Sequence, residues 1–149
     1  MSMGSEDAGS GVAGASYLEA PSVEFNVGLD VEDVERFASV SNDPGMAGLF
    51  TPGEHEHCAI SPDAAGRYAG TWCAKEAAIK ALWPWVKLDP RRVEVLRADD
   101  GRPGVIVSGW DAAASGVTVR VSISHGRSFA SACAVAWGPP PSPTLAHSP

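Results

Sequence analysis

Apolar and polar residues alternate between positions 23 and 29, where the odd positions hold Val, Phe, Val and Leu. Successive side chains of a strand point to opposite faces of a sheet. The alternation therefore predicts a half-buried strand that ends on Asp30. Val31, Val34 and Phe37 then recur at helical spacing, which predicts a helix that begins directly after Asp30.

A longer pattern with the helical period covers residues 64–82 and ends before Pro84. The residue that precedes a proline disfavours helical geometry, so Pro84 marks the helix end. Residues four apart lie on the same face of a helix. This face carries one row of side chains: Tyr68, Trp72, Glu76 and Lys80.

A shorter helix is predicted to begin at Thr51-Pro52-Gly53-Glu54. A threonine hydroxyl can cap the helix, a proline suits the first turn, and a glutamate three residues later can reach back to the cap. We therefore expect structural roles for Thr51 and Glu54.

Four further strands are predicted, at residues 93–96, 105–107, 117–124 and 129–137. The last two flank the hairpin-like turn His125-Gly126-Arg127-Ser128, which places His125 at a strand end. The core is thus predicted to mix helices and strands, and no internal repeat divides it.

Composition sets the limits of this core. Residues 1–21 are rich in Gly, Ser and Ala, and residues 138–149 contain five prolines, so we expect disorder at both ends. A single domain is expected over residues 22–137.

The net charge of −7 argues against a nucleic acid partner, and no apolar run is long enough for a membrane span or a signal peptide. Three widely spaced cysteines favour a reducing cytoplasm over a disulfide framework.

The segment Thr71–Ala81 carries the most informative chemistry, because Glu76 and Lys80 lie four residues apart on one helix face. Lys75 lies about 100° around the helix and points elsewhere. A carboxylate beside an ammonium can be a solvated ion pair, or a site where Glu76 holds a hard metal ion and Lys80 meets phosphate. Spacing alone favours the ion pair.

Four motifs change this interpretation: Gly28-Leu29-Asp30, Phe50-Thr51-Pro52-Gly53-Glu54, the run from Trp72 to Lys80, and Ser122-Ile123-Ser124-His125. Each alone is weak, but their order and spacing resemble the 4'-phosphopantetheinyl transferases, and specifically the small holo-[acyl-carrier-protein] synthase type. The resemblance runs from about Asn26 to Trp137. The segment Gly101-Arg102-Pro103 is similar to the actinobacterial members.

The resemblance implies a small α+β fold in which an antiparallel sheet packs on a long helix. It also implies a homotrimer with each active site between neighbouring subunits, where Gly101-Arg102-Pro103 is expected to come from the next chain. The implied reaction transfers 4'-phosphopantetheine from coenzyme A to a serine of apo acyl carrier protein and releases adenosine 3',5'-bisphosphate. Magnesium is the implied cofactor, held by Asp30 and Glu76. The alternative for Asp30 is an N-cap of the helix that follows it.

Further roles follow from the same resemblance. Lys80 is expected to contact phosphate and to protonate or neutralise the leaving group. His125, beside Ser122 and Ser124, is expected to bind a coenzyme A phosphate or to shuttle a proton, although a solvated turn histidine is the alternative. The acceptor of the serine proton is open between a magnesium-bound water and Glu76 acting through a water.

Arg36 and Phe37 are expected to dock the carrier, as a charge anchor beside an apolar contact. An ordinary exposed arginine is the alternative. Acyl carrier proteins are usually acidic and this chain is acidic too, so docking would need a local basic patch.

The chain departs from the family pattern at two places. Thr71 stands where the family commonly has an arginine, and Arg67, one turn earlier, could substitute for it. Leu82-Trp83-Pro84-Trp85 replaces the usual glycines near coenzyme A, so the tryptophans either stack on adenine or pack in the core or against another subunit. These departures leave a non-catalytic coenzyme A-binding or carrier-docking subunit open. A second alternative, a transferase for polyketide or peptide synthase carriers, has the same chemistry and a different carrier. The run His55-Glu56-His57-Cys58 is not expected to bind zinc, because adjacent helix residues diverge.

Overall fold

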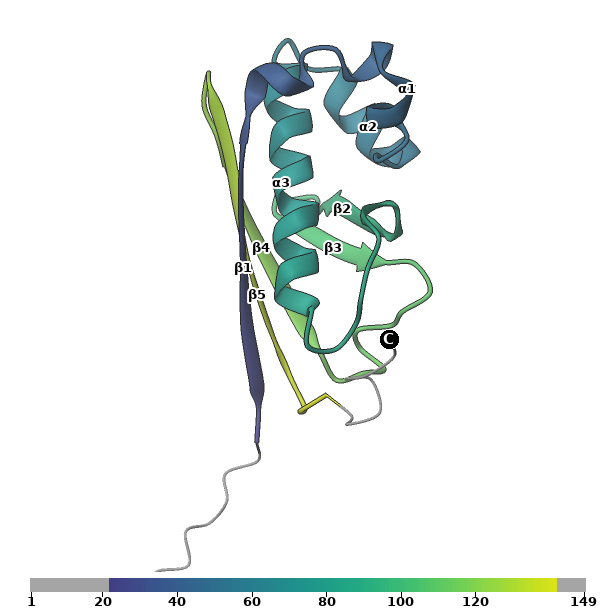
Figure 1. The fold of residues 1–149 in the computed structure, drawn as a ribbon, viewed down its shortest axis with the longest axis vertical. Coiled ribbons are helices and arrows are strands. Elements are labelled where there is room, and N and C mark those ends of the chain that lie inside the picture. The colour runs from purple at the N-terminus through teal and green to yellow at the C-terminus, as the bar shows by residue number, and fades with distance from the viewer. Residues whose placement is uncertain (1–21, 142–149) are drawn as a thin grey trace, which may run out of the picture.

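The structure is a computed structural model, and it describes residues 22–141. A three-stranded antiparallel sheet has the order β1 (Glu24–Asp33), β5 (Phe129–Gly138), β4 (Thr118–His125). The long helix α3 (Ala64–Leu82) covers one face of this sheet (Figure 1). A second antiparallel pair, β2 (Val93–Arg97) and β3 (Pro103–Val107), lies on the other side of α3 from β1. The remaining elements are short helices: η1 (Val34–Phe37), η2 (Val40–Asn42), α1 (Pro44–Ala47), α2 (Pro52–Ala59) and η3 (Pro90–Arg92).

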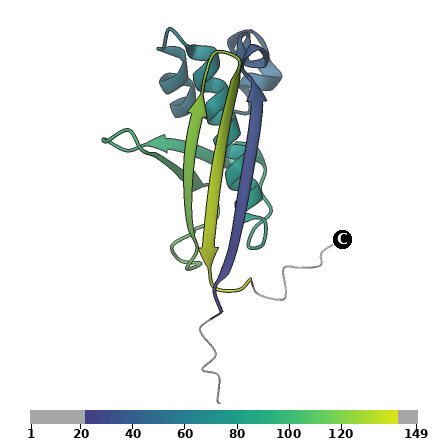
Figure 2. The ribbon, with the colours of Figure 1, turned by 90° about the vertical axis from the view of Figure 1, so that its left-hand side faces the viewer.

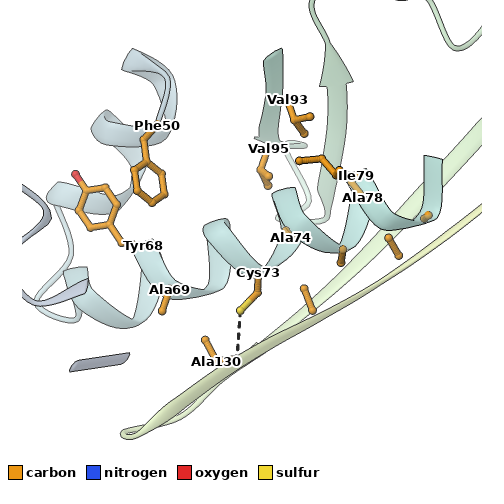
Figure 3. Close-up of a cluster of buried hydrophobic side chains, with 14 of the residues drawn as sticks. Phe50, Tyr68, Ala69, Cys73, Ala74, Ala78, Ile79, Val93, Val95 and Ala130 are labelled. Carbon is orange, nitrogen blue, oxygen red and sulfur yellow. Dashed lines mark hydrogen bonds between the residues drawn. The ribbon is translucent and has the colours of Figure 1, made fainter. Parts of the chain in front are cut away.

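Small side chains form the contact between the sheet and α3. The inner face of β5 presents four buried alanines. They pack against further buried alanines and Cys73 on α3 (Figure 3). The Cys73 thiol lies 3.4 Å from the carbonyl oxygen of Ala130. Because both surfaces lack bulk, the helix axis can approach the sheet closely. The inner alanines of β5 are Ala130, Ala132, Ala134 and Ala136.

Strand β1 is held against α3 at two points. A Cβ atom placed on Gly28 would lie 1.9 Å from the backbone oxygen of Ala77, so only glycine fits there. Two residues earlier, the Asn26 side-chain amide donates to the carbonyl oxygens of Lys80 and Ala81, at 2.9 and 3.0 Å. These carbonyls lie in the last turn of α3, where helix carbonyls lack intrahelical partners.

On strands β1 and β5 the outer face of the sheet is largely apolar, and no residue in 22–141 covers it. Its β1 and β5 side chains are between 37% and 64% exposed, and Figure 2 views the sheet from this side. A contiguous apolar face of this kind is typical of an interaction surface. It consists of Phe25, Val27, Leu29, Val31, Phe129 and Trp137.

Most of the predicted elements are confirmed. The helix over residues 64–82 has the predicted bounds, and all four later strands form within one or two residues of their predicted ends. The α+β fold is confirmed as well. No helix in residues 22–141 is both long enough and apolar enough to cross a membrane.

The first helix begins later than predicted. β1 continues through Asp30 to Asp33, and a short 3-10 helix starts at Val34. The side chain of Asp33, rather than that of Asp30, caps it by accepting from Glu35 N. The N-cap alternative for Asp30 is therefore wrong, because Asp30 lies inside the strand.

The last strand ends one residue past the predicted domain boundary at Trp137. Gly138 is the last residue of β5, and the Trp85 indole donates to the carbonyl oxygen of Pro139 at 2.7 Å. The predictions for residues 1–21 and 142–149 lie outside the described residues.

The predicted capping of α2 is confirmed. Thr51 Oγ1 accepts from Glu54 N, and the Glu54 carboxylate accepts from Thr51 N at 2.8 Å. Glu54 has two more partners that the sequence did not suggest. Its carboxylate accepts from Val95 N at 2.8 Å and from Lys75 Nζ at 2.7 Å, and the Glu54 and Lys75 side chains are both fully buried. The capping glutamate thus also joins α2 to α3 and β2.

Candidate active site

Asp30, Glu76 and Lys80 meet at the contact between β1 and α3. Lys80 Nζ donates to Asp30 Oδ1 at 2.7 Å and to the carbonyl oxygen of Leu29 at 2.9 Å. The Asp30 side chain is 14% exposed and that of Lys80 is 48% exposed, so the pair lies at an opening of the core. The structure therefore brings together residues about fifty positions apart in the chain.

Three carboxylates share the electrostatic field of this cluster. Burial raises the pKa of Glu76, and the charges of Asp30 and Glu32 raise it further while Lys80 lowers it. The hydrogen bond to Asp30 raises the pKa of Lys80 above its ordinary value, so its ammonium stays charged at neutral pH. Burial and the charges of Asp30 and Glu32 raise the pKa of the Cys73 thiol to about 12, which makes it unreactive.

The carboxylates fit a magnesium ion. Asp30 Oδ2 is buried and has no hydrogen-bond partner, which is costly unless a cation or water meets it. The charge of Asp30 acts on Glu76, so the two carboxylates lie close enough to repel each other. Residues 22–141 contain no group of three His, Cys, Asp or Glu side chains placed to bind one metal ion. A pair of carboxylates that leaves several positions for water and phosphate is the set that magnesium accepts.

Ser122 and His125 do not join this cluster within one chain. β1 and β4 lie on opposite sides of β5, roughly 10 Å apart by strand spacing. Ser122 is exposed on the outer face, paired with the exposed Cys133. His125 ends β4 as predicted, and its Nδ1 lies 3.4 Å from an Asp63 carboxylate oxygen.

Arg36 and Phe37 differ in exposure, although the Arg36 guanidinium lies 5.9 Å from the centroid of the Phe37 ring. The Arg36 side chain is 57% exposed and pairs with Glu32. Phe37 is only 3% exposed and belongs to the core. An exposed apolar contact at Phe37 is therefore wrong, because neighbours in a 3-10 helix point in different directions. Of the two residues, Arg36 alone is exposed and so able to contact a partner.

The two departures from the family pattern have structural consequences. Thr71 is buried, 3.5 Å from the Cys58 sulfur. Arg67 donates to the carbonyl oxygen of His57 at 3.0 Å. Trp85 is buried, which supports core packing, whereas Trp83 is exposed and lies under the Lys87 ammonium at 3.3 Å.

In the run from His55 to Cys58, the side chains of His55 and Cys58 pack against neighbouring residues of the core. Both ring nitrogens of His55 have partners, the Tyr68 hydroxyl at 2.8 Å and the Ala47 carbonyl oxygen at 2.9 Å. Cys58 is buried in another direction. These side chains do not converge on a point where a metal ion could bind.

Sequence reasoning missed Glu32 as a member of the acidic cluster. Glu32 lies two residues after Asp30 on the same strand, and so on the same face of the sheet. The alternation that begins at position 23 continues through it, and that signal could have identified it. It was hidden because Val31, Val34 and Phe37 also fit a helix.

The chain matches the family model described as the 4'-phosphopantetheinyl transferase superfamily over residues 26–134. It is 35% identical to a holo-[acyl-carrier-protein] synthase of Chlorobium limicola, over 74% of this chain and 92% of that protein. The Saccharomyces cerevisiae fatty acid synthase subunit alpha is 39% identical over 66% of this chain, which is 6% of that protein. A solved Chronobacterium ammoniagenes ACPS–CoA complex matches with a TM-score of 0.65 and 28% identity, over 77% of this chain and 98% of that chain. With its β1–α3 cluster inside the matched region, the chain belongs to the 4'-phosphopantetheinyl transferase superfamily.

Proposed function

We propose that this protein transfers the 4'-phosphopantetheine group of coenzyme A to a serine of an apo acyl carrier protein. The serine oxygen attacks the β-phosphorus of coenzyme A, and the bond to adenosine 3',5'-bisphosphate breaks. The observation that carries the proposal is the convergence of Asp30, Glu76 and Lys80 in a chain of this superfamily. The similarity to holo-[acyl-carrier-protein] synthases supports the choice of substrates.

Asp30 and Glu76 would hold magnesium, whose charge would offset that of the pyrophosphate. Lys80 has a different task. Its ammonium is half-exposed and keeps its proton, so it neutralises the leaving phosphate rather than protonating it. The serine proton would pass to a water, either one bound to the magnesium or one hydrogen-bonded to Glu76.

Three copies of the chain would form the complete enzyme. The uncovered apolar face of β1 and β5 supports such an assembly, because it would otherwise remain in water. Ser122 and His125 lie away from Asp30 in one chain, so they would serve a site that includes a neighbouring subunit. Sedimentation tests this step. Leu29→Asp should yield monomers, and a monomeric wild-type protein would contradict the assembly.

Arg36 is the proposed anchor for an acidic carrier, from its exposure beside the acidic cluster. A fatty-acid carrier is favoured by the similarity to a fatty acid synthase subunit. Polyketide and peptide carriers are the alternative. The proposed location is the cytoplasm, since the three cysteines, all in the described residues, are free thiols.

The direct test is incubation of the protein with coenzyme A, magnesium and a panel of apo-carriers, followed by mass spectrometry of the carrier serine. We expect modification that depends on magnesium. Asp30→Ala and Glu76→Ala should abolish it, whereas Glu56→Gln, an exposed carboxylate on α2, should leave it unchanged. Retained coenzyme A binding without modification of any carrier would instead favour a non-catalytic subunit.

A further inference from the structure

Helix α3 ends just before a proline that cannot continue its hydrogen bonds. In an α-helix, the N–H group of each residue donates to the carbonyl oxygen four positions earlier. The donor for the Lys80 carbonyl would come from position 84, which holds Pro84 and so has no N–H group. Trp83 N reaches Lys80 O only at 3.4 Å, longer than an ordinary hydrogen bond of this kind. The main chain therefore gives the Lys80 carbonyl only a weak donor.

Asn26 supplies the missing donor from another element. Its side-chain amide donates to Lys80 O at 2.9 Å and to Ala81 O at 3.0 Å. Asn26 belongs to β1, which runs beside α3 (Figure 1). A side-chain amide has two N–H groups, so a single residue can serve both carbonyls. Asn26 thus provides from outside the helix the hydrogen bond that Pro84 cannot make.

The next two carbonyls have partners nearby in the chain. Leu82 O accepts from Trp85 N at 2.9 Å. Trp83 O accepts from Lys87 Nζ at 3.2 Å. The two carbonyls bonded to Asn26 differ because their strong donor comes from a distant segment. The last turn of α3 is therefore held in place by β1.

The same strand also holds the far end of the Lys80 side chain. Lys80 Nζ donates to Leu29 O at 2.9 Å and to Asp30 Oδ1 at 2.7 Å. Asn26 and Asp30 lie four residues apart on β1, about 13 Å along the strand. A half-exposed lysine otherwise moves among many rotamers. Here β1 binds both the carbonyl oxygen and the ammonium of one residue.

We propose that Asn26 is a positioning residue for Lys80: by holding the last turn of α3 on β1, it places the Lys80 ammonium beside Asp30. Without the Asn26 amide, the last turn is free to open locally, and the ammonium loses its fixed place. That this placement serves phosphate transfer rests on the proposed function. The placement itself does not, so the two can be tested separately.

Nuclear magnetic resonance of the lysine ammonium groups tests the placement without any reaction. The protons of an ammonium group exchange quickly with water unless hydrogen bonds hold them, and the chain has only three lysines to assign. Asn26→Leu keeps nearly the size of the side chain and removes both donors. In magnesium-free buffer it should speed the proton exchange of the Lys80 ammonium about tenfold, as expected when two hydrogen bonds that support its place are lost. The fully buried Lys75 is the internal reference, and its exchange should not change.

Asn42→Leu is the matched control, because Asn42 is exposed at the end of η2. It should leave the exchange of Lys80 as in the wild type. Asn26→Ala removes the donors without adding bulk, and it should reproduce the effect of leucine even if leucine prevents folding. Unchanged exchange at Lys80 in a folded Asn26 variant refutes the positioning role, whatever the protein modifies. Faster exchange supports that role even if the wild type modifies no carrier, an outcome that contradicts only the proposed function.

Kinetics test whether the placement serves the reaction. The leaving phosphate gains charge in the transition state, so a displaced ammonium should lower kcat rather than raise KM for the carrier. In Asn26→Leu we expect kcat to fall about tenfold, with that KM within about twofold of the wild type. In a Lys80→Met background, the same change at position 26 should have no further effect. An equal loss of kcat in both backgrounds contradicts an action through Lys80.

Discussion

Helix α3 carries two lysine–carboxylate pairs of equal length and opposite character. Lys75 meets Glu54 and Lys80 meets Asp30, each with a nitrogen–oxygen distance of 2.7 Å. The first pair is fully buried, whereas the side chains of the second are 48% and 14% exposed. Distance alone therefore does not distinguish a structural pair from a candidate catalytic one.

The hydrogen bonds of the carboxylates make the distinction. Both oxygens of Glu54 are satisfied: one accepts from Val95 N, and the other from Thr51 N and Lys75 Nζ. In Asp30, Oδ1 accepts from Lys80 while Oδ2 has no partner. We call the Glu54–Lys75 pair closed, because both of its carboxylate oxygens are bonded and the network fixes α2, α3 and β2 relative to one another. We call the Asp30–Lys80 pair open, because Asp30 Oδ2 is left for a ligand.

The largest expected effect concerns the closed pair. Glu54→Ala leaves the Lys75 ammonium buried and alone, which should lower the free energy of unfolding by about 3–5 kcal/mol. Urea denaturation measures it. Glu54→Gln/Lys75→Met keeps most of the volume and removes both charges, so it should be less harmful than the single change. If Glu54→Ala unfolds at the wild-type urea concentration, the pair does not hold α2 to α3.

A change in the open pair, Asp30–Lys80, should alter the rate of carrier modification rather than the stability of the fold. Asp30→Asn keeps the size of the side chain and removes its charge. We expect the rate of carrier modification to fall on the order of 100- to 1,000-fold, as when one charge-stabilising group is lost from an active site. The melting temperature should stay close to that of the wild type. A large fall in melting temperature would place Asp30 with the structural pair instead.

A third pair, in which the cation is the more exposed partner, extends the series. Arg36 pairs with Glu32 at the end of β1 and remains more than half exposed. Because exposed charges steer partners more than they stabilise folds, Arg36→Glu should raise KM for an acidic carrier about tenfold and leave stability unchanged. An unchanged KM, measured at low ionic strength, refutes the docking role. Arg91→Gln, an exposed arginine paired with Asp89, serves as the control.

The smallest effect is a gain of stability. Glu76 has a raised pKa in the folded protein, so between its unfolded and folded pKa values the folded state binds more protons. Stability should therefore fall as pH rises through that interval, and the loss should persist at neutral pH. In a chelator, Glu76→Gln should melt slightly higher than the wild type at pH 7 and nearly equally at pH 4. A lower melting temperature at pH 7 contradicts the crowding of carboxylates.

Local patterns predicted the elements better than they predicted contacts. The helix over residues 64–82 followed from a repeated row of side chains and a proline beyond its end. The capping of α2 followed because Thr51 and Glu54 lie within one helical turn. Both signals depend on neighbours in sequence, where spacing determines which side chains can meet.

The misses concern which way a residue faces and which distant segment it meets. The apolar spacing after Asp30 fits both a helix and a continuing strand, and pairing of β1 with β5 along its full length decided the outcome. Phe37 was expected beside Arg36 at the surface, but adjacency does not fix orientation. Lys75 was expected to point away from Glu76, and it does, but no local pattern could name Glu54 as its partner across 21 positions. The roles assigned to Asp30, Glu76, Lys80, Ser122 and His125 stay predictions.

Gly28 shows how a residue without a side chain can fix the geometry of a reaction. Since the β1 and α3 backbones touch at this residue, main-chain atoms set the spacing of the strand and helix segments that carry Asp30 and Glu76. Thermal fluctuations that deform the rest of the core would move these two segments as one body. Only the side-chain torsions would then adjust when a substrate arrives, and even one added methyl group at position 28 would push the two segments apart.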